Sequence, residues 1–225
     1  MDTSRLKEFT KFLDKELVPG VDELEKLSDN NRKHIQKLVY TNLVDRFDYA
    51  IDKLLLENCR EEQLITKAFE GNNQPVTESD LVTLLLKSDD LQSALNTRLQ
   101  DKLRLTVLRQ RHSRKLFTFL SMCDEIGEFD KKPRVNPSTG EILDSFKVQI
   151  KTTPHSLCGY ADWLYSRRNA IVHGAGAAKF LDNDEKQIKK HYKVEVTKTF
   201  KISTSSIRTA VKFYQSLCDN LNSNG

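Results

Sequence analysis

The sequence predicts a mainly α-helical bundle with a small β insertion. Apolar residues recur at helical spacing through most of the chain, and the longest such stripe runs from about Asn30 to Asn58. Two other segments, 146–150 and 192–202, alternate between apolar and polar residues instead, which is typical of strands. We therefore expect one long central helix, further helices packed around it, and two short strands able to pair with each other.

The 225 residues are expected to form a single helical domain, whose elements pack around that central helix. Pro19 and Gly20 predict the end of the first helix, and the polar residues 182–185 predict a loop. In chain order, the expected parts are N-terminal helices (1–27), bundle helices (28–126), a loop and β insertion (127–153), one further helix (154–176), and a β segment with the C-terminal helix (177–225).

Composition and charge allow a polyanionic partner without requiring one. The chain has 36 basic and 32 acidic residues, a net charge of +4, and a pI of about 8.8. No apolar run approaches the ~20 residues of a membrane span, and the N-terminus lacks the apolar core of a signal peptide. The four scattered cysteines predict packed thiols rather than disulfides or a zinc site. We expect a cytoplasmic protein without membrane association, metal or cofactor.

The most informative stretch of the sequence is the helix expected between residues 154 and 176. An apolar and aromatic run at 158–165 predicts that this helix is buried. Gly174 and Gly176 follow it, as is common at helix C-termini. Polar residues just before these glycines would therefore lie at the end of a core helix.

Arg168, Asn169 and His173 form an Arg-Asn-x3-His pattern at this position. The pattern resembles the signature of the HEPN superfamily, whose active members are mostly metal-independent endoribonucleases that work as dimers. The resemblance is sharp over about 155–176 and only architectural elsewhere. It implies an up-and-down helical bundle, RNA as substrate, and a composite active site in a homodimer.

The three side chains have the chemistry that such a reaction needs. RNA carries its own nucleophile, the 2′-hydroxyl, so cleavage requires a base, an acid and a cation for the phosphate. His173 can serve as base or acid near neutral pH, and Arg168 can hold two phosphate oxygens in one fork. Asn169 can donate to a phosphate oxygen or orient His173. Arg167 can add a second phosphate contact.

The spacing of the pattern favours a dimer. Arg168 and His173 are five residues apart and diverge by about 140° on a continuous helix. A two-fold axis that places two such helices face to face would bring both sets of side chains around one phosphate.

The resemblance also implies a biological setting of defence, stress response or toxin–antitoxin control, with an antitoxin or regulatory protein as partner. Some members of the family carry a tyrosine two residues after the histidine, which a partner antitoxin can modify. Here that position is Ala175. This departure argues against a toxin that is regulated in that way.

Further charged residues are candidates for RNA contact or for support of the motif. Arg104, Arg111, Arg114 and Lys115 lie in a basic segment that either tracks an RNA backbone or forms a solvated face. A second basic group lies at 189–201, with the same two interpretations. Asp45 and Asp48, on the long helix, either contact Arg168 or His173 or are surface acids.

Two other interpretations of the chain stay open. One is a non-catalytic HEPN module that binds RNA or a protein partner and whose Arg168 and His173 are structural, capping carbonyls or pairing with acids. The other is an unrelated helical scaffold, which predicts a monomer or a dimer interface far from His173.

Overall fold

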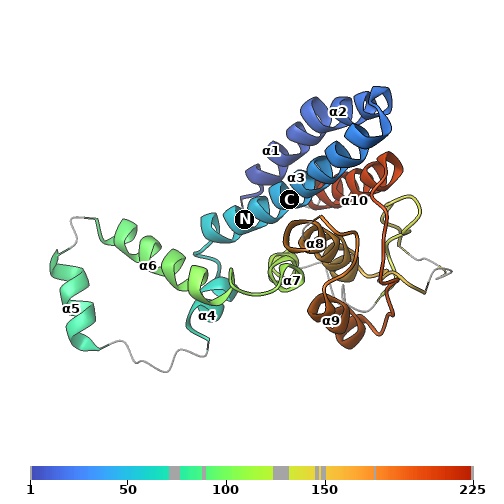
Figure 1. Ribbon diagram of the computed structural model, residues 1–225. Coiled ribbons are helices and arrows are strands. Elements are labelled where there is room, and N and C mark those ends of the chain that lie inside the picture. The colour runs from blue at the N-terminus through green and yellow to red at the C-terminus, as the bar shows by residue number, and fades with distance from the viewer. Residues whose placement is uncertain are drawn as a thin grey trace.

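The computed structural model describes residues 2–70, 77–87, 90–123, 132–144, 147, 151–174 and 176–223, and the predicted mainly α-helical bundle is confirmed within them (Figure 1). A π-helical turn (Leu13–Leu17) and a 3₁₀ turn (Leu24–Lys26) accompany the α-helices. The α-helices are α1 (Ser4–Phe12), α2 (Val18–Glu23), α3 (Asp29–Glu57), α4 (Glu62–Phe69), α5 (Glu78–Lys87), α6 (Leu91–Thr106), α7 (His112–Ser121), α8 (Leu157–His173), α9 (Asp182–Tyr192) and α10 (Thr204–Ser223).

α3 is the axis of the bundle, as its long apolar stripe predicts (Figure 1). α1 and α10 pack along it and against each other, and α2 packs against α10. α7 and α8 also pack against α3 and against each other, and α9 packs on α8. α4 and α6 pack together in an arm that extends from the bundle, with α5 beside α6 at its far end.

Aromatic side chains of three helices meet at the middle of α3. The Phe47 ring centre lies 4.3 Å from that of Tyr214 in α10 and 5.3 Å from that of Phe9 in α1. Nearby on α3, the buried Tyr40 hydroxyl donates a 3.0 Å hydrogen bond to the carbonyl of Leu164 in α8. α3 is thus joined to α8 by a polar contact as well as by packing.

The N-terminal helices follow one another without the break predicted at Pro19 and Gly20. The π-helical turn separates α1 from α2, and the Val18 N–H donates to the Leu13 carbonyl. Pro19 therefore falls in the first turn of α2, where a helix has no acceptor for its N–H. The prediction of a helix end at this proline is wrong.

The predicted strands are not seen in the described part of the chain. Backbone hydrogen bonds of 2.8 and 3.0 Å join residues 198–200 to 178–180 around an isolated antiparallel bridge. Tyr192 belongs to α9, and only residues 198–200 of the expected 192–202 strand thus pair, with 178–180. Of its expected partner, 146–150, only Lys147 lies within the described residues, and it is not in a strand.

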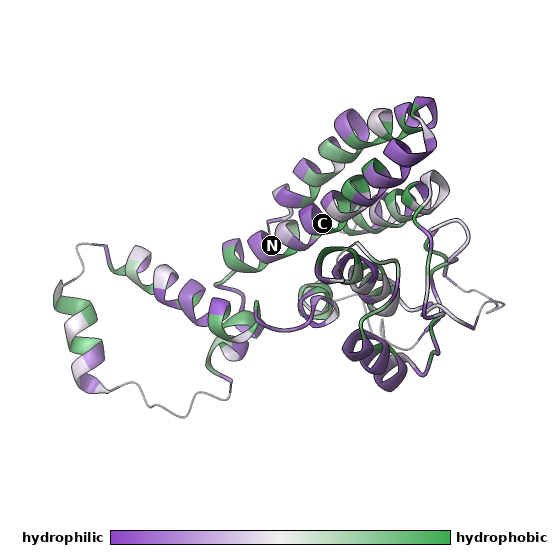
Figure 2. Ribbon diagram, viewed as in Figure 1, coloured by the Kyte–Doolittle hydropathy of each residue, from purple (hydrophilic) through white to green (hydrophobic). Residues whose placement is uncertain are grey.

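Residues 182–185 begin helix α9 instead of the predicted loop. Acidic residues fill the first turn of α9 and basic residues its last turn, which complements the helix dipole. Figure 2 shows that α9 is hydrophilic along most of its length, so it lacks the apolar stripe that identifies a helix from sequence. Ile188 anchors it by packing with Phe180 and Val196 in a small second core. The alternation in 192–202 places side chains in this core.

We expect Phe47→Ala to lower the free energy of unfolding by about 3–5 kcal/mol, because it removes the ring that α1 and α10 share. Tyr49→Ala is the control, since Tyr49 lies on the same helix but is 62% exposed, and its effect should stay below about 1 kcal/mol. Urea unfolding followed by circular dichroism measures both. Equal effects of the two substitutions would contradict the assignment of Phe47 to the centre of the core.

Candidate functional site

α8 is a helix whose N-terminus is capped and whose C-terminus is bound to α3. The Ser156 hydroxyl accepts a 3.2 Å hydrogen bond from the Gly159 N–H, as an N-cap does. At the other end, the Gly176 N–H donates to the Ile171 carbonyl at 2.9 Å, a bond typical of glycine-terminated helices. The Lys37 ammonium of α3 donates to the Gly176 carbonyl at 2.6 Å. The C-terminus of α8 is therefore held against α3.

Arg167 is part of the interior. Its residue surface is only 5% exposed, and one Nη donates a 2.8 Å hydrogen bond to the Lys201 carbonyl. Its guanidinium carbon lies 4.5 to 5.4 Å from the ring centres of Trp163, Phe200 and Tyr40. Such contacts stabilise a cation in an apolar setting. The predicted RNA contact of Arg167 is thus corrected, because the side chain joins α8 to the extended segment and faces away from solvent.

Arg168 lies at the surface between α8 and α3. Its Nε lies 2.5 Å from Asp45 Oδ1, as an ion pair and not as an aligned hydrogen bond. Its guanidinium carbon lies 5.7 Å from the ring centre of Tyr165, and one Nη donates to Asn169 Oδ1 at 3.2 Å. The side chain keeps 19% of its surface exposed, although its Nε is buried.

Asn169 points to α9 and not to His173. Its Nδ2 donates a 3.3 Å hydrogen bond to Oδ2 of Asp184, while Oδ1 of the same carboxylate accepts a 2.8 Å bond from Arg111 Nη1. Asp184 is buried at the start of α9. The amide of Asn169 is therefore tied to the contact between α8, α9 and the start of α7.

Arg111 is the centre of this contact. Its Nε lies 2.8 Å from both carboxylate oxygens of Asp162, and Nη2 donates to the Ser166 hydroxyl at 2.9 Å. Asp162 is 0% exposed. Burial raises the pKa of the Asp162 carboxyl, and the adjacent Arg111 guanidinium opposes that rise. One cation thus compensates two buried carboxylates, on α8 and α9.

His173 is the last residue of α8, and its side chain is exposed. It forms no hydrogen bond or ion pair with another residue of the described ranges. Arg168 lies on a different face of the helix, because five residues correspond to a rotation of about 140°. Within one chain, the fold therefore does not bring these two side chains together.

A second polar cluster joins α7 to α3 and was not predicted. His112 Nδ1 lies 2.6 Å from Asp48 Oδ1, and the Lys115 ammonium lies 2.7 Å from Asp48 and 2.6 Å from Asp52. Burial raises the pKa of Asp48, but its hydrogen bond to His112 and the nearby cations lower it to about 2. The His112 ring also stacks on Tyr165, with centres 4.9 Å apart.

A sequence signal for this cluster exists. The two acids are four residues apart on α3, and the two bases are three residues apart on α7, so each pair occupies one helix face. Asp45 does contact Arg168, as one interpretation of the sequence held, whereas Asp48 contacts His112 and Lys115 instead.

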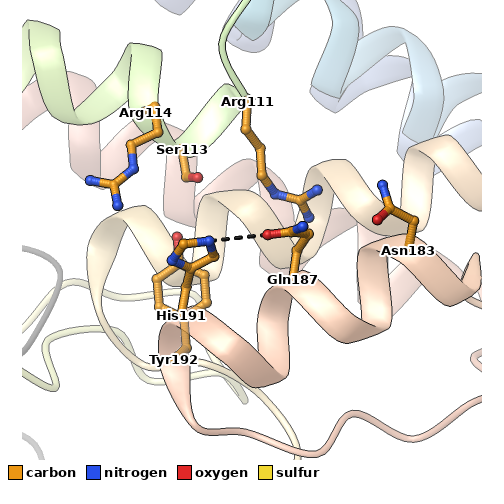
Figure 3. A pocket seen from close by; sticks show the side chains of 7 residues that line it. All are labelled: Arg111, Ser113, Arg114, Asn183, Gln187, His191 and Tyr192. Carbon is orange, nitrogen blue, oxygen red and sulfur yellow. Dashed lines mark hydrogen bonds between the residues drawn. The ribbon is translucent and has the colours of Figure 1, made fainter.

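The predicted basic cluster does not form one surface. Arg104 is exposed on α6, where it pairs with Asp101 at 2.6 Å. Lys115 is buried between carboxylates of α3, which corrects the prediction that it contacts RNA. Arg111 and Arg114 line a cavity of about 490 Å³ between α7 and α9 (Figure 3). These two arginines are therefore the members of the cluster that share a concave surface.

Two further properties concern the described ranges alone. Within them, no three His, Cys, Asp or Glu side chains are grouped so as to hold a metal ion. None of the helices there has the length and apolarity that crossing a membrane demands. Cys59, Cys158 and Cys218 are buried, and none of these three cysteines is in a disulfide.

Comparisons of the chain with protein-family models, with curated proteins and with solved structures yield no match. The functional interpretation consequently depends on the residues of α8 and on their contacts with α3, α7 and α9.

We expect Arg111→Ala to destabilise the fold by about 3–5 kcal/mol, because it leaves Asp162 as an unpaired buried charge. Adding Asp162→Asn should recover part of this loss, since the amide removes that charge. Arg208→Ala is the control, because Arg208 forms an exposed ion pair whose removal should cost less than about 1 kcal/mol. Urea unfolding of the wild type, the two single variants Arg111→Ala and Asp162→Asn, their double variant and the Arg208→Ala control measures the coupling. Strictly additive effects of the two buried substitutions would contradict it.

Proposed function

We propose that this chain is a metal-independent endoribonuclease of the HEPN type, cytoplasmic, which cleaves RNA by attack of the 2′-hydroxyl. The observation that carries the proposal is that Arg168 and His173 have different environments on α8. Arg168 is held near the surface by Asp45 and Tyr165, while His173 is exposed at the helix end. A fixed cation and an accessible imidazole on one short helical segment are the groups that such a reaction uses.

In the proposed reaction, His173 exchanges protons with the reacting oxygens. A base removes the proton of the 2′-hydroxyl, the oxygen attacks the adjacent phosphorus, and the bond to the 5′-oxygen breaks as an acid protonates it. The products are a 2′,3′-cyclic phosphate and a 5′-hydroxyl. The Arg168 guanidinium stabilises the charge on the five-coordinate phosphate. Asn169 acts as a positioning residue, because Asp184 holds its amide.

The surface around Arg168 supports a homodimer as the active form. Val172 lies one turn from Arg168 on the same face of α8 and is 46% exposed. Leu38 lies two turns from Asp45 on the same face of α3 and is 52% exposed. Two exposed apolar side chains thus flank the Arg168–Asp45 pair, as at the core of an interface. A second copy on this face would supply the His173 that one chain holds apart from Arg168.

A non-catalytic module that binds RNA or a protein is the second candidate, and a specific observation favours it. Arg168 is paired with Asp45, and Asn169 is hydrogen-bonded to Asp184, so both side chains already serve the fold. This candidate predicts binding without cleavage. A setting in defence or toxin–antitoxin control, with an antitoxin or regulatory protein as partner, is implied by the HEPN resemblance alone and belongs to the proposal.

We expect the chain to be a dimer at micromolar concentration and Leu38→Asp or Val172→Asp to weaken it, because each places a charge in the apolar surface beside Arg168. Leu86→Asp is the matched control, since Leu86 is 80% exposed on α5, at the far end of the arm. Analytical ultracentrifugation measures the dissociation constant of each variant. A wild type that stays monomeric, or equal dissociation constants for all variants, would contradict the composite site.

We expect the purified chain to cut single-stranded RNA in the presence of a chelator and to leave cyclic phosphate ends. DNA, and RNA methylated at the scissile 2′-oxygen, should resist because the nucleophile is missing. His173→Ala should slow cleavage by about 10²–10⁴-fold through loss of proton transfer. Arg168→Ala should slow it by about 10²–10³-fold through loss of charge stabilisation.

His34→Ala and Arg208→Ala are the matched controls, because they remove an exposed histidine of α3 and an exposed arginine of α10. Gel electrophoresis and mass spectrometry of the RNA fragments measure rate and end groups. The proposal fails if cleavage needs Mg²⁺, or if folded His173→Ala cuts at the wild-type rate. Binding of RNA with no cleavage would favour the non-catalytic module.

A further inference from the structure

A cavity of about 490 Å³, lined mostly by side chains that carry polar or charged groups, lies between the first turn of α7 and one face of α9 (Figure 3). Its volume falls in the range of small-ligand sites. α7 contributes one wall and α9 contributes the other, and the side chains of both helices face the space between them. The cavity is distinct from the exposed His173 at the end of α8.

The α7 side of the cavity suits a phosphate group. No side chain of the described residues caps the first turn of α7. The Arg114 N–H donates to the Arg111 carbonyl at 2.8 Å, which leaves the N–H groups of His112 and Ser113 and the helix dipole for an anion. Ser113 in this turn is only 6% exposed, lines the cavity and forms no hydrogen bond with another residue of the described ranges. Arg111 and Arg114 line the same wall. A buried hydroxyl among these groups is suited to donate to a phosphate oxygen.

The α9 side of the cavity suits a nucleobase. Asn183 and Gln187 place side-chain amides there, which have both donors and acceptors for the edge of a base. Tyr192 contributes an aromatic wall, and its ring is packed against the α8 backbone at Gly159, where a Cβ atom would lie 2.9 Å from it. His191 lines the same wall, and its Nε2 lies 3.1 Å from Gln187 Oε1. Amides beside an aromatic ring are common in base recognition.

Charge and position connect this cavity with the motif on α8. The Arg111 charge is already compensated by Asp162 and Asp184, so the site favours one phosphate over a polyphosphate. Asp184 accepts from Arg111 with one oxygen and from Asn169 with the other. A ligand beside Arg111 would thus be connected to Asn169 of the proposed catalytic helix through the Asp184 carboxylate.

We propose that this cavity is a subsite that binds one ribonucleotide of the RNA substrate, with its phosphate at the first turn of α7 and its base against α9. The inference rests on the proposed endoribonuclease function for its biological meaning, but nucleotide binding tests it separately. Asn183 and Gln187 are then specificity-determining residues, since they select the base next to the site of cleavage.

The experiment is an NMR or calorimetric titration of the full chain with inorganic phosphate, with ribose-containing nucleosides, and with each of the four ribonucleoside 5′-monophosphates. We expect monophosphates to bind more tightly than phosphate or nucleosides alone, and one base to be preferred. Gln187→Ala should weaken the preferred monophosphate by about 3- to 10-fold, as expected for one lost hydrogen bond. Gln92→Ala, which removes an exposed glutamine of α6, should leave binding unchanged.

Ser113→Ala provides the second variant, because it alters the phosphate end and should weaken all monophosphates alike. Phosphate binding as tight as that of every nucleotide, or no binding at millimolar concentration, would overturn the subsite. RNA cleavage by the same variants separates the two proposals. If nucleotides bind as expected but no RNA is cut, the endoribonuclease proposal fails and the subsite stands. If RNA is cut and Gln187→Ala and Asn183→Ala keep the wild-type site preference, the subsite fails and the activity stands.

Discussion

The contact of Arg111 with Asp162 and Asp184 is the constraint on which this part of the fold depends. Asp162 is fully buried in α8, and an uncompensated carboxylate there would be strongly unfavourable. The guanidinium therefore fixes where α7 begins relative to α8 and α9. Because Asp184 of α9 also binds Asn169, the position of the Arg-Asn-x3-His motif depends on the charge of Arg111, which lies outside the motif.

The two adjacent arginines of α8 show how a helix separates roles between neighbours. A rotation of about 100° per residue turns Arg167 into an aromatic interior and leaves Arg168 at the surface beside Asp45. Contacts with three aromatic rings and one carbonyl stabilise the charge of the buried arginine, so this side chain packs as part of the interior. The surface arginine keeps part of its side chain exposed. The two residues are of the same type and adjacent in the sequence, and only their positions around the helix axis distinguish them.

Apolar periodicity was enough to predict the helical class, the long central helix and the glycine-terminated α8. It could not predict α9, whose single buried apolar residue, Ile188, gives no periodic stripe. For the site, the sequence located Arg168, Asn169 and His173 but not their partners, since Arg111 and Asp162 are 51 residues apart and such a pairing leaves no local pattern. The basic segment predicts RNA contact for Lys115 only on the assumption that charged side chains are exposed, whereas the carboxylates of α3 allow its burial.

The arm formed by α4, α5 and α6 leaves and rejoins the bundle at neighbouring points, because α4 packs against α6 and α6 also touches α3 (Figure 1). The segment between α3 and α7 thus forms an arm whose two ends lie close together at the bundle. Residues at its base, such as Leu64 and Leu103, belong to the main core, whereas α5 lies beyond it. A change in the length of the distal arm would therefore leave the register between α3, α7 and α8 unchanged.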